Sequence, residues 1–383
     1  MFLAFVLLGF VDPVVTHVSI DCGRLFPYWP HEYHVINLLD ECGLDPEIYF
    51  PEVGSEEWET VAPSDLGWDV DAIPDLLQFL EEHETRAFLL TIHGRLVLEY
   101  YWGENLSGQP FNKDSWWYWA SAGKTLTATL VGVTQWEGLL SLEDASSDYL
   151  GSGWTSLNTN QEDAITVWHQ LTMTTGLDDG VGDPNCTDPE CLIYLAEPGS
   201  RWAYHNAAYT KLYDVVEQAT GSRFTAYFNS RIRDPIGMDG QWYDSEYNHV
   251  YYSKPRSMMR FGLLILNEGR WEAGPFLLDP AFYEEMVHTS QSLNESYGYL
   301  WWLNGKSSYM LPGLQDVFSG MICPHAPDDM IAAMGKNGQL INVVPGLGLV
   351  MVRMGSQPTP SVTSAVFQDQ LWEKLNPVLS ISN

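Results

Sequence analysis

Apolar residues recur at intervals of three and four along several stretches of the chain, which predicts amphipathic helices there. In residues 69–83 the apolar positions are Val70, Ile73, Leu76, Leu77 and Leu80. Gly221 and the Pro235-Ile-Gly237 turn are typical helix stops in the middle of the chain. Further helices are predicted at residues 121–138, 165–173, 206–220, 224–232, 257–266 and 361–379.

Short runs rich in β-branched and aromatic residues predict strands. Residues 86–92 and 95–102 form two such runs, and His93-Gly94 between them is typical of a hairpin. Later runs lie at residues 297–303, 315–321, 329–334, 340–344 and 349–354. Strands that follow one another in hairpin order favour an antiparallel sheet. We therefore predict an α+β fold, in which one antiparallel sheet is flanked by the N- and C-terminal helices and carries a mostly helical insert.

This pattern divides the chain into three parts. Residues 1–66 predict a signal-like segment followed by an N-terminal extension packed on the body. Residues 67–120 and 255–383 would form the sheet domain, and residues 121–254 the helical domain. A cleft between two such parts is a natural place for a ligand site.

The composition limits the classes of partner. With 50 acidic and 18 basic residues the formal charge is −32, which repels nucleic acid and anionic lipid. No stretch approaches the roughly 18 uninterrupted apolar residues of a membrane-spanning helix, so a soluble chain is expected. The histidines are scattered, without the spacing of a zinc site. We expect a small-molecule partner and no metal or other cofactor.

The N-terminus and the cysteines bear on the cellular compartment. The apolar run in MFLAFVLLGFVDP has the length of a signal-peptide core but lacks a preceding basic residue. A degraded or truncated export signal is expected, and a buried strand or a mis-called start is the alternative. Cys22 with Cys42, and Cys186 with Cys191, could form disulfides, which would suit an exported protein; five free cysteines are the alternative. Cys323 would be left over. Export to the periplasm or outside the cell is the expectation.

The segment SWWYWASAGKTLTATL contains the only Ser-x-x-Lys of the chain, Ser121 to Lys124. At the start of a helix these two residues lie on one face. A serine hydroxyl needs a base to become a nucleophile, and a buried lysine in its neutral form can be that base. The ordinary alternative is a serine helix cap with a solvated lysine, but the flanking residues are apolar or neutral.

Two Tyr-x-Asn triplets offer a partner for this pair. Tyr204-His-Asn206 follows a turn and precedes a helix, so Tyr204 can relay a proton there. Asn206 can orient Lys124, bind a substrate carbonyl or cap the helix. Tyr227-Phe-Asn229 lies inside a helical pattern, where Tyr227 is expected in the core.

A third candidate element lies between two strand-like runs, at Gly335-Lys336-Asn337-Gly338-Gln339. Its backbone could offer an N–H group to an oxyanion beside that of Ser121. Asn337 and Gly338 are the candidates for this role, and Lys336 would add positive charge. A hairpin turn with an exposed lysine is the alternative.

Taken in order, these elements resemble the serine β-lactamase and penicillin-recognising superfamily, in particular its class C, family VIII esterase and 6-aminohexanoate-dimer hydrolase branch. The resemblance covers about residues 67–380 and includes SAGK, PGSRWAYHN, DPIGM and GKNGQLINVVPGLGLVMV. HQLTMTTGL is similar to the family's HLLTHTSGL, with Met173 where a second histidine is usual, which favours a structural role. The resemblance implies a β-lactamase/transpeptidase-like fold.

The resemblance also implies an acyl-enzyme on Ser121, with Lys124 and Tyr204 moving protons. The family's Lys-Thr-Gly triplet is missing from residues 329–335, which shifts the expectation from a β-lactamase to an esterase or amidase. A β-lactamase or D-alanyl-D-alanine peptidase activity is the first alternative. A non-catalytic binding protein, using 16 tryptophans and 20 tyrosines to stack on ligands, is the second, and a metallohydrolase is a distant third.

Overall fold

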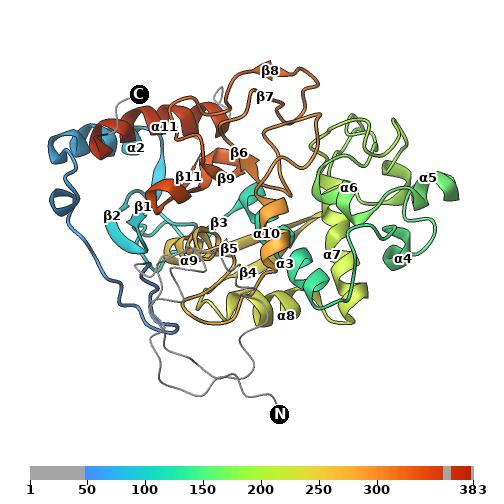
Figure 1. Ribbon diagram of the computed structural model, residues 1–383, viewed down its shortest axis with the longest axis horizontal. Helices are drawn as coiled ribbons and strands as arrows, with labels where there is room; N and C mark the ends of the chain where they lie inside the picture. Colours follow the sequence, from blue (N-terminus) through green and yellow to red (C-terminus); the bar gives the residue numbers. More distant parts are fainter. Residues whose placement is uncertain (1–47, 357–363, 381–383) are drawn as a thin grey trace, which may run out of the picture. The chain divides into compact units, whose positions relative to one another are not determined.

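The computed structural model describes residues 48–356 and 364–380. Its main sheet has six strands in the order β2-β1-β11-β10-β9-β6, and all neighbours are antiparallel (Figure 1). The strands are β1 (Thr85–Ile92), β2 (Arg95–Tyr101), β6 (Trp302–Leu303), β9 (Ile331–Gly335), β10 (Gln339–Val344) and β11 (Leu349–Gly355). The two β-rich ends of the chain therefore meet in one sheet, which confirms the predicted α+β fold.

The β1–β2 hairpin shows how local sequence sets the sheet. His93 and Gly94 have φ values of 44° and 79°, the left-handed pair that a two-residue hairpin turn needs. A side chain at Gly94 would also collide with the carbonyl oxygen of Tyr49, 1.8 Å from the position of a Cβ atom. The segment before the body thus packs on this turn, and Thr60 pairs with Leu96 at the sheet edge.

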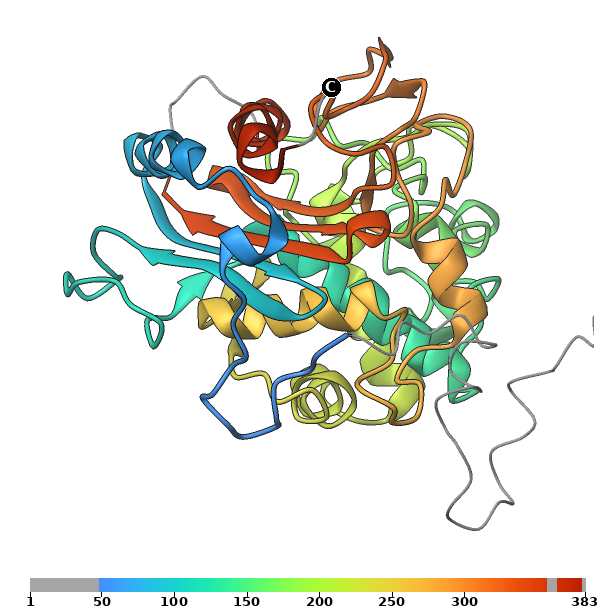
Figure 2. The ribbon, with the colours of Figure 1, turned by 60° about the vertical axis from the view of Figure 1, so that its left-hand side comes forward.

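Helices cover both faces of the sheet. In Figure 2, α2 (Ile73–Glu82) and α11 (Ser364–Leu379) lie on one side of the strands and α9 (Pro255–Leu266) on the other. Because both faces are covered, every residue of β10 and β11 is buried. The helix α9 approaches so closely that a Cβ atom on Gly262 would lie 2.4 Å from Val350.

The middle of the chain is largely helical, as predicted. It contains α3 (Lys124–Trp136), α4 (Ser147–Leu150), α5 (Thr159–Asp163), α6 (Val167–Leu171), α7 (Asn206–Thr220) and α8 (Phe224–Phe228). A π-helical turn, Asn229–Arg233, extends α8, and α10 (Pro280–Met286) follows α9. Short 3-10 turns lie at η1 (Pro63–Leu66), η2 (Val70–Ala72), η4 (Pro189–Cys191) and η7 (Pro345–Leu347). The division into separate sheet and helical domains stays a prediction.

A three-stranded sheet was not expected from the sequence. It consists of β3 (Trp117–Tyr118), β5 (Asn248–Ser253) and β4 (Gln241–Ser245), in that order. Two of its strands lie inside the segment expected to be mostly helical. Its inner side chains, Trp242 and Tyr251, pack against each other at 5.0 Å between ring centroids. Because β3 leads directly into the Ser121 turn, this sheet fixes where that turn begins.

Two predicted strands are much shorter than expected. Residues 297–303 fold back on themselves, since Tyr297 pairs with Trp302 and Leu300 has a φ of 60°; only Trp302–Leu303 joins the main sheet. In residues 315–321 only β8 (Phe318–Ser319) is a strand, and it pairs with β7 (Ser308–Tyr309) in a separate ribbon. Runs rich in β-branched and aromatic residues therefore predicted strands that are too long where the chain turns within a few residues.

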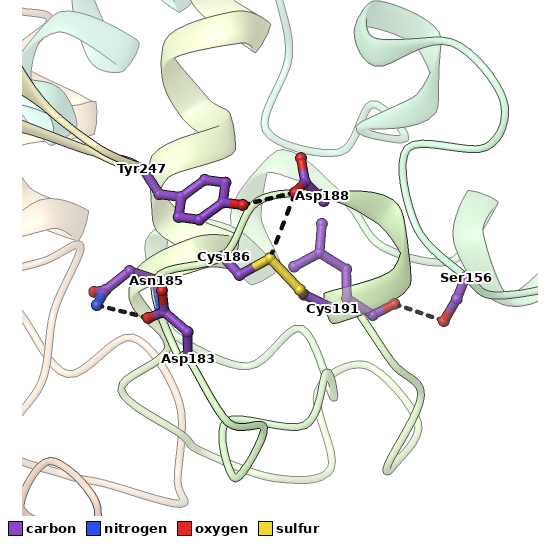
Figure 3. Close-up of a disulfide and its surroundings, with 8 residues drawn as sticks. Ser156, Asp183, Asn185, Cys186, Asp188, Cys191 and Tyr247 are labelled. Carbon is purple, nitrogen blue, oxygen red and sulfur yellow. Dashed lines mark hydrogen bonds between the residues drawn. A yellow bond between two sulfur atoms is a disulfide. The ribbon is translucent and has the colours of Figure 1, made fainter.

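The cysteines follow the prediction where they are described. Cys186 and Cys191 form a disulfide (Figure 3), and Cys323 is a buried free thiol. The pair Cys22 and Cys42, like the signal-like segment, lies outside the described residues. Among the helices that are described, none is long and apolar enough to cross a membrane.

A buried arginine joins the two ends of the chain. Arg353 on β11 is fully buried, and its guanidinium donates hydrogen bonds to the carbonyl oxygens of His83, Asn337 and Gly338 and to Thr85 Oγ1. Its guanidinium carbon also lies 4.6 Å from the ring centroid of Phe367 on α11. This one side chain therefore connects α2, β1, the β9–β10 turn and α11.

Replacing Arg353 with methionine should cost about 3 kcal/mol or more of unfolding free energy, because several buried acceptors lose their donor together. Urea denaturation measures this loss. The control is Arg95→Met, which removes an exposed ion pair with Glu59; such a pair contributes about 0–1 kcal/mol. Equal effects of the two changes would contradict the role given to Arg353.

Candidate functional site

Ser121 lies in a tight turn between a strand and a helix. The strand β3 ends at Tyr118, a 3-10 turn η3 spans Ala120–Gly123, and α3 begins at Lys124. Ala120 has a φ of 47°, a left-handed conformation that costs a non-glycine residue roughly 1 kcal/mol. The first N–H groups of such a turn have no partner within it. The Ser121 amide is therefore available to a ligand.

Lys124 is buried beside this serine. Its Nζ donates a hydrogen bond to Ser121 Oγ over 3.1 Å, and the residue is only 6% exposed. Burial lowers the pKa of Lys124 to about 7, and no neighbouring carboxylate opposes that shift among the described residues. The solvated first-turn lysine is thus ruled out.

Two tyrosine rings enclose the amine. Lys124 Nζ lies 4.5 Å from the ring centroid of Tyr209 and 5.1 Å from that of Tyr204. A ring face attracts an ammonium group, so these contacts stabilise the protonated form while burial favours the neutral one. An amine under two such opposing influences can gain and lose a proton near neutral pH.

The position of Tyr204 is fixed from two sides. Its ring stacks on Trp302 with 6.0 Å between centroids. Next to it, the Ala203 amide donates to the carbonyl oxygen of Met173 over 2.9 Å. The segment HQLTMTTGL thus supports the tyrosine from behind. Burial raises the pKa of Tyr204 well above its ordinary value, an effect that hydrogen bonding with Ser121 partly opposes. The phenol is neutral at physiological pH.

Asn206 is the first residue of α7, while His205 is the N-cap. The side chain of Asn206 does not cap the helix; its Nδ2 donates to Asn185 Oδ1 over 2.9 Å. Its own Oδ1 is buried without a hydrogen-bond partner in the described structure. Of the roles expected for this residue, helix capping is therefore wrong.

The β9–β10 turn lies against the Ser121 turn through Gly335, whereas the sequence suggested Asn337 and Gly338. A Cβ atom on Gly335 would lie 2.4 Å from the carbonyl oxygen of Trp119 and 2.9 Å from the amide of Ala122, so only glycine fits. Beyond it the 3-10 turn η6 (Lys336–Gly338) begins. The Asn337 side chain donates to Tyr118 Oη over 2.8 Å. The Asn337 and Gly338 carbonyls accept from Arg353, so both residues are engaged in holding the turn.

Two cationic side chains lie in the segments singled out from the sequence, Arg201 in PGSRWAYHN and Lys336 just beyond β9. Lys336 is exposed at the end of β9. Arg201 is paired with Asp179 over 2.6 Å. The second Tyr-x-Asn triplet is remote from this chemistry, since Tyr227 is buried and donates to Glu137 over 2.9 Å. Within the described residues, no three His, Cys, Asp or Glu side chains gather in a way that could hold a metal ion.

A sequence model of the family described as Beta-lactamase matches residues 78–368, about three quarters of the chain. The chain belongs to the β-lactamase family. Two of the solved structures with a similar fold are described as hydrolases.

Individual relatives of this β-lactamase-family chain are distant. Penicillin-binding protein 4* of Bacillus subtilis (strain 168) is 25% identical over 178 residues, which cover 42% of this chain and 38% of that protein. The match thus spans well under half the length of this curated relative.

Solved structures share the fold. One described as a 6-aminohexanoate-dimer hydrolase from Bacillus anthracis has a TM-score of 0.62 at 19% identity, covering 84% of this chain and 87% of its own. EstCE1, a hydrolase with promiscuous acyltransferase activity, has a TM-score of 0.60 at 15% identity, covering 82% and 99%. A penicillin-binding protein homologue from Caulobacter crescentus has a TM-score of 0.60 at 14% identity, covering 80% and 98%.

Sequence reasoning missed the aromatic residues that surround the amine. Tyr209, Trp302 and Tyr297 come from α7 and from the segment near β6, and they contact Lys124 or Tyr204. Tyr209 could have been found, because it lies in the first two turns of the helix that Tyr204 precedes. Trp302 and Tyr297 are nearly a hundred residues further along, and no local pattern links them to Tyr204.

Replacing Lys124 with methionine should stabilise the fold by about 1–4 kcal/mol at pH 6, because a desolvated amine is replaced by an apolar side chain of similar length. The pKa falls from 10.5 to about 7 on folding. The unfolded chain therefore binds more protons between these values, and wild-type stability rises with pH across that window. The stability gap should shrink between about pH 7 and 10.

Urea denaturation at pH 6 and pH 10 measures this gap. The matched control is Lys211→Met, which removes a partly exposed lysine paired with Asp214 on α7 and should change stability by less than about 1 kcal/mol. A less stable Lys124→Met variant at pH 6 would show that the amine is not held against a desolvation cost.

Proposed function

We propose that this protein is a serine hydrolase that cleaves an ester or amide bond through an acyl-enzyme on Ser121. The observation that carries the proposal is the 3.1 Å contact between Lys124 Nζ and Ser121 Oγ, with the amine buried and its pKa lowered to about 7. A structural lysine has no need of this arrangement, which leaves an amine without a counter-charge beside a hydroxyl.

In the first step Ser121 Oγ attacks the substrate carbonyl carbon, and its proton passes to the neutral Lys124 amine. Tyr204 remains a phenol at neutral pH, so it serves as the donor that protonates the leaving oxygen or nitrogen as its bond to carbon breaks. The proton that Lys124 received replaces the one lost by Tyr204. In the second step water attacks the acyl carbon and gives a proton to Lys124, Tyr204 donates its proton to Ser121 Oγ as the acyl bond breaks, and the proton on Lys124 restores the phenol.

The developing oxyanion needs two N–H donors. One is the Ser121 amide at the start of the 3-10 turn. For the other we propose the Lys336 amide, which follows Gly335 where that glycine lies against the Ser121 turn. Asn337, the earlier candidate, is less suited because its side chain and carbonyl hold the β9–β10 turn.

The strand beside the serine favours a neutral substrate. The strand β9 reads Ile-Ala-Ala-Met-Gly and offers no hydroxyl or cationic side chain for a substrate carboxylate. Arg201 is paired with Asp179 and Lys336 is exposed. Esters and uncharged amides are therefore the proposed substrates, ahead of β-lactams, whose carboxylate would find no hydroxyl or cationic side chain on β9.

A fluorophosphonate probe should label Ser121 in the intact protein, and short p-nitrophenyl esters should be hydrolysed faster than nitrocefin. Ser121→Ala should abolish labelling and lower kcat/KM by at least about 10³-fold. Tyr204→Phe should lower kcat by about 10²-fold or more. Tyr227→Phe, in the other Tyr-x-Asn triplet, is the matched control and should leave kcat unchanged. No labelling and no ester turnover by the wild type would refute a hydrolase at Ser121.

The pH dependence separates the two candidate bases. With Lys124 as base, kcat/KM should fall about tenfold per pH unit below about 7, where the amine is protonated, and level off above it. Initial rates on one uncharged ester between pH 5 and 10 measure the profile. The midpoint should stay near 7 in Tyr204→Phe. A rate that continues to rise beyond pH 9 would assign the base to the tyrosine instead.

A further inference from the structure

A cluster of three buried hydroxyl groups lies one helical turn beyond Lys124. Thr127 Oγ1 on α3 lies 3.1 Å from Tyr209 Oη, and Tyr209 Oη lies 3.2 Å from Tyr213 Oη, both on α7. Thr127 is 0% exposed and each tyrosine is 5% exposed. Buried hydroxyl groups need hydrogen-bond partners, and these three satisfy one another. The cluster therefore ties α3 to α7 next to the turn that carries the amine.

Thr127 differs from the other threonines of its helix. A threonine inside a helix commonly donates back to a carbonyl oxygen of the preceding turn. Three threonines of α3 do so, namely Thr125, Thr129 and Thr134. Thr127 instead places its hydroxyl against Tyr209 on the neighbouring helix. Because Lys124 and Thr127 are three residues apart, they lie on one face of α3, and the ring that Thr127 holds lies beside the amine.

The ring held in this way faces the amine. Lys124 Nζ lies 4.5 Å from the ring centroid of Tyr209, closer than the 5.1 Å to that of Tyr204. A ring face attracts an ammonium group, and the attraction is stronger where water is excluded. Burial lowers the pKa of Lys124 to about 7, and the ring face acts in the opposite direction. Tyr209 therefore favours the protonated amine at a position where little else does.

The other groups that face the amine are uncharged. They are the Ser121 hydroxyl, from the turn before α3, and the Tyr204 phenol, from the corner before α7. Tyr297 contacts Tyr204 from the segment near β6, and burial raises its pKa well above the ordinary value. Burial also raises the pKa of Tyr209 to about 12. The phenols thus stay neutral while Lys124 titrates.

On the basis of the proposed function, we infer that Tyr209 is a positioning residue of this hydrolase. When Ser121 attacks the substrate, its proton passes to Lys124 and the amine becomes an ammonium group. The ring face of Tyr209 stabilises that ammonium group and keeps it beside Ser121 Oγ, while the hydroxyl of Tyr209 holds the ring through Thr127. The ring itself neither gives nor takes a proton.

Removing the ring tests this inference. In Tyr209→Leu the ammonium form loses its attraction, so the pH midpoint of kcat/KM on p-nitrophenyl acetate should fall by about half a pH unit or more. The plateau value of kcat/KM should fall about threefold to tenfold, since a weaker base accepts the serine proton. Tyr209→Phe keeps the ring face and should hold the wild-type midpoint. Water that entered a gap would raise the midpoint instead, because solvation favours the charged amine.

A substitution of nearly the same size tests the ring face in a core that keeps its packing. A phenylalanine with three ring hydrogens replaced by fluorine, at position 209, has less negative charge on its face, so its midpoint should lie below that of Tyr209→Phe. The matched control is Tyr283→Leu. This tyrosine is also 5% exposed and donates to the carbonyl oxygen of Ile265 over 2.9 Å. The control should lose stability and keep the wild-type midpoint.

The titration can also be followed without any reaction. In protein labelled with ¹³C-lysine, the Cε resonance of Lys124 reports its protonation, and Lys124→Met assigns the signal. The same downward shift is expected in Tyr209→Leu. This measurement excludes a contribution from His249, which pairs with Asp244 and stacks on Tyr213 with 4.4 Å between ring centroids.

The outcomes are distinguishable. A midpoint that rises in Tyr209→Leu, or that moves equally in Tyr283→Leu, would overturn the inference and leave the hydrolase intact. Equal midpoints for the fluorinated ring and Tyr209→Phe would also overturn it, since the charge on the ring face would then have no effect. Absence of ester turnover by the wild type, with Ser121 unlabelled, would overturn the proposed function and the catalytic role of Tyr209 together. The lysine titration separates that case, because it needs no turnover.

Discussion

The burial of the Lys124 amine next to the Ser121 hydroxyl is the constraint on which the site depends. An amine can be kept neutral near pH 7 only if water and carboxylates are both kept away from it. The first eleven residues of α3 are buried, and the rings of Tyr209 on α7 and of Tyr204 just before it close around Nζ. The fold therefore supplies a dry position for a polar group, at a cost in stability that a purely structural lysine would not impose.

Three segments distant in the chain must meet for this to work. The strand β3 and the turn η3 present the serine, the corner before α7 presents Tyr204, and the end of β9 lies against the serine turn. Gly335 permits that last contact because its backbone approaches where no side chain would fit. Arg353 on β11 then fixes the turn beyond Gly335 by donating hydrogen bonds to its carbonyl oxygens. The site is thus supported by the sheet on one side and by α7 on the other.

The overall charge and the local electrostatics are separate properties of this protein. The chain carries a formal charge of −32, yet desolvation alone shifts the pKa of Lys124. Acidic residues such as Asp183 and Asp188 lie instead on the disulfide loop, where the first bonds to Asn185 and the second to Tyr247. Charge on the surface is screened by water and salt within about 10 Å, so it governs partners more than the chemistry inside.

The sequence by itself determined the elements whose signals are local. The helix at residues 206–220 and the β1–β2 hairpin agree with their predicted bounds to within a residue, since helical periodicity and turn residues act over a few positions. The pairing of Ser121 with Lys124 followed from helical spacing, and the ordered motifs indicated the family. The cysteines at 186 and 191 were close enough in sequence to suggest their disulfide.

Only the tertiary structure decided the rest. The pairing of β3 with β5 joins segments more than a hundred residues apart, and no local pattern encodes it. The sequence suggested Asn337 as the residue beside the Ser121 turn. Gly335 lies there instead, because of how β9 packs on η3. The Asn206 side chain does not cap α7, because it donates a hydrogen bond to Asn185 instead. Hydrogen bonds and close backbone contacts are settled by distances of a few ångströms in space, which the chain acquires only once it has folded.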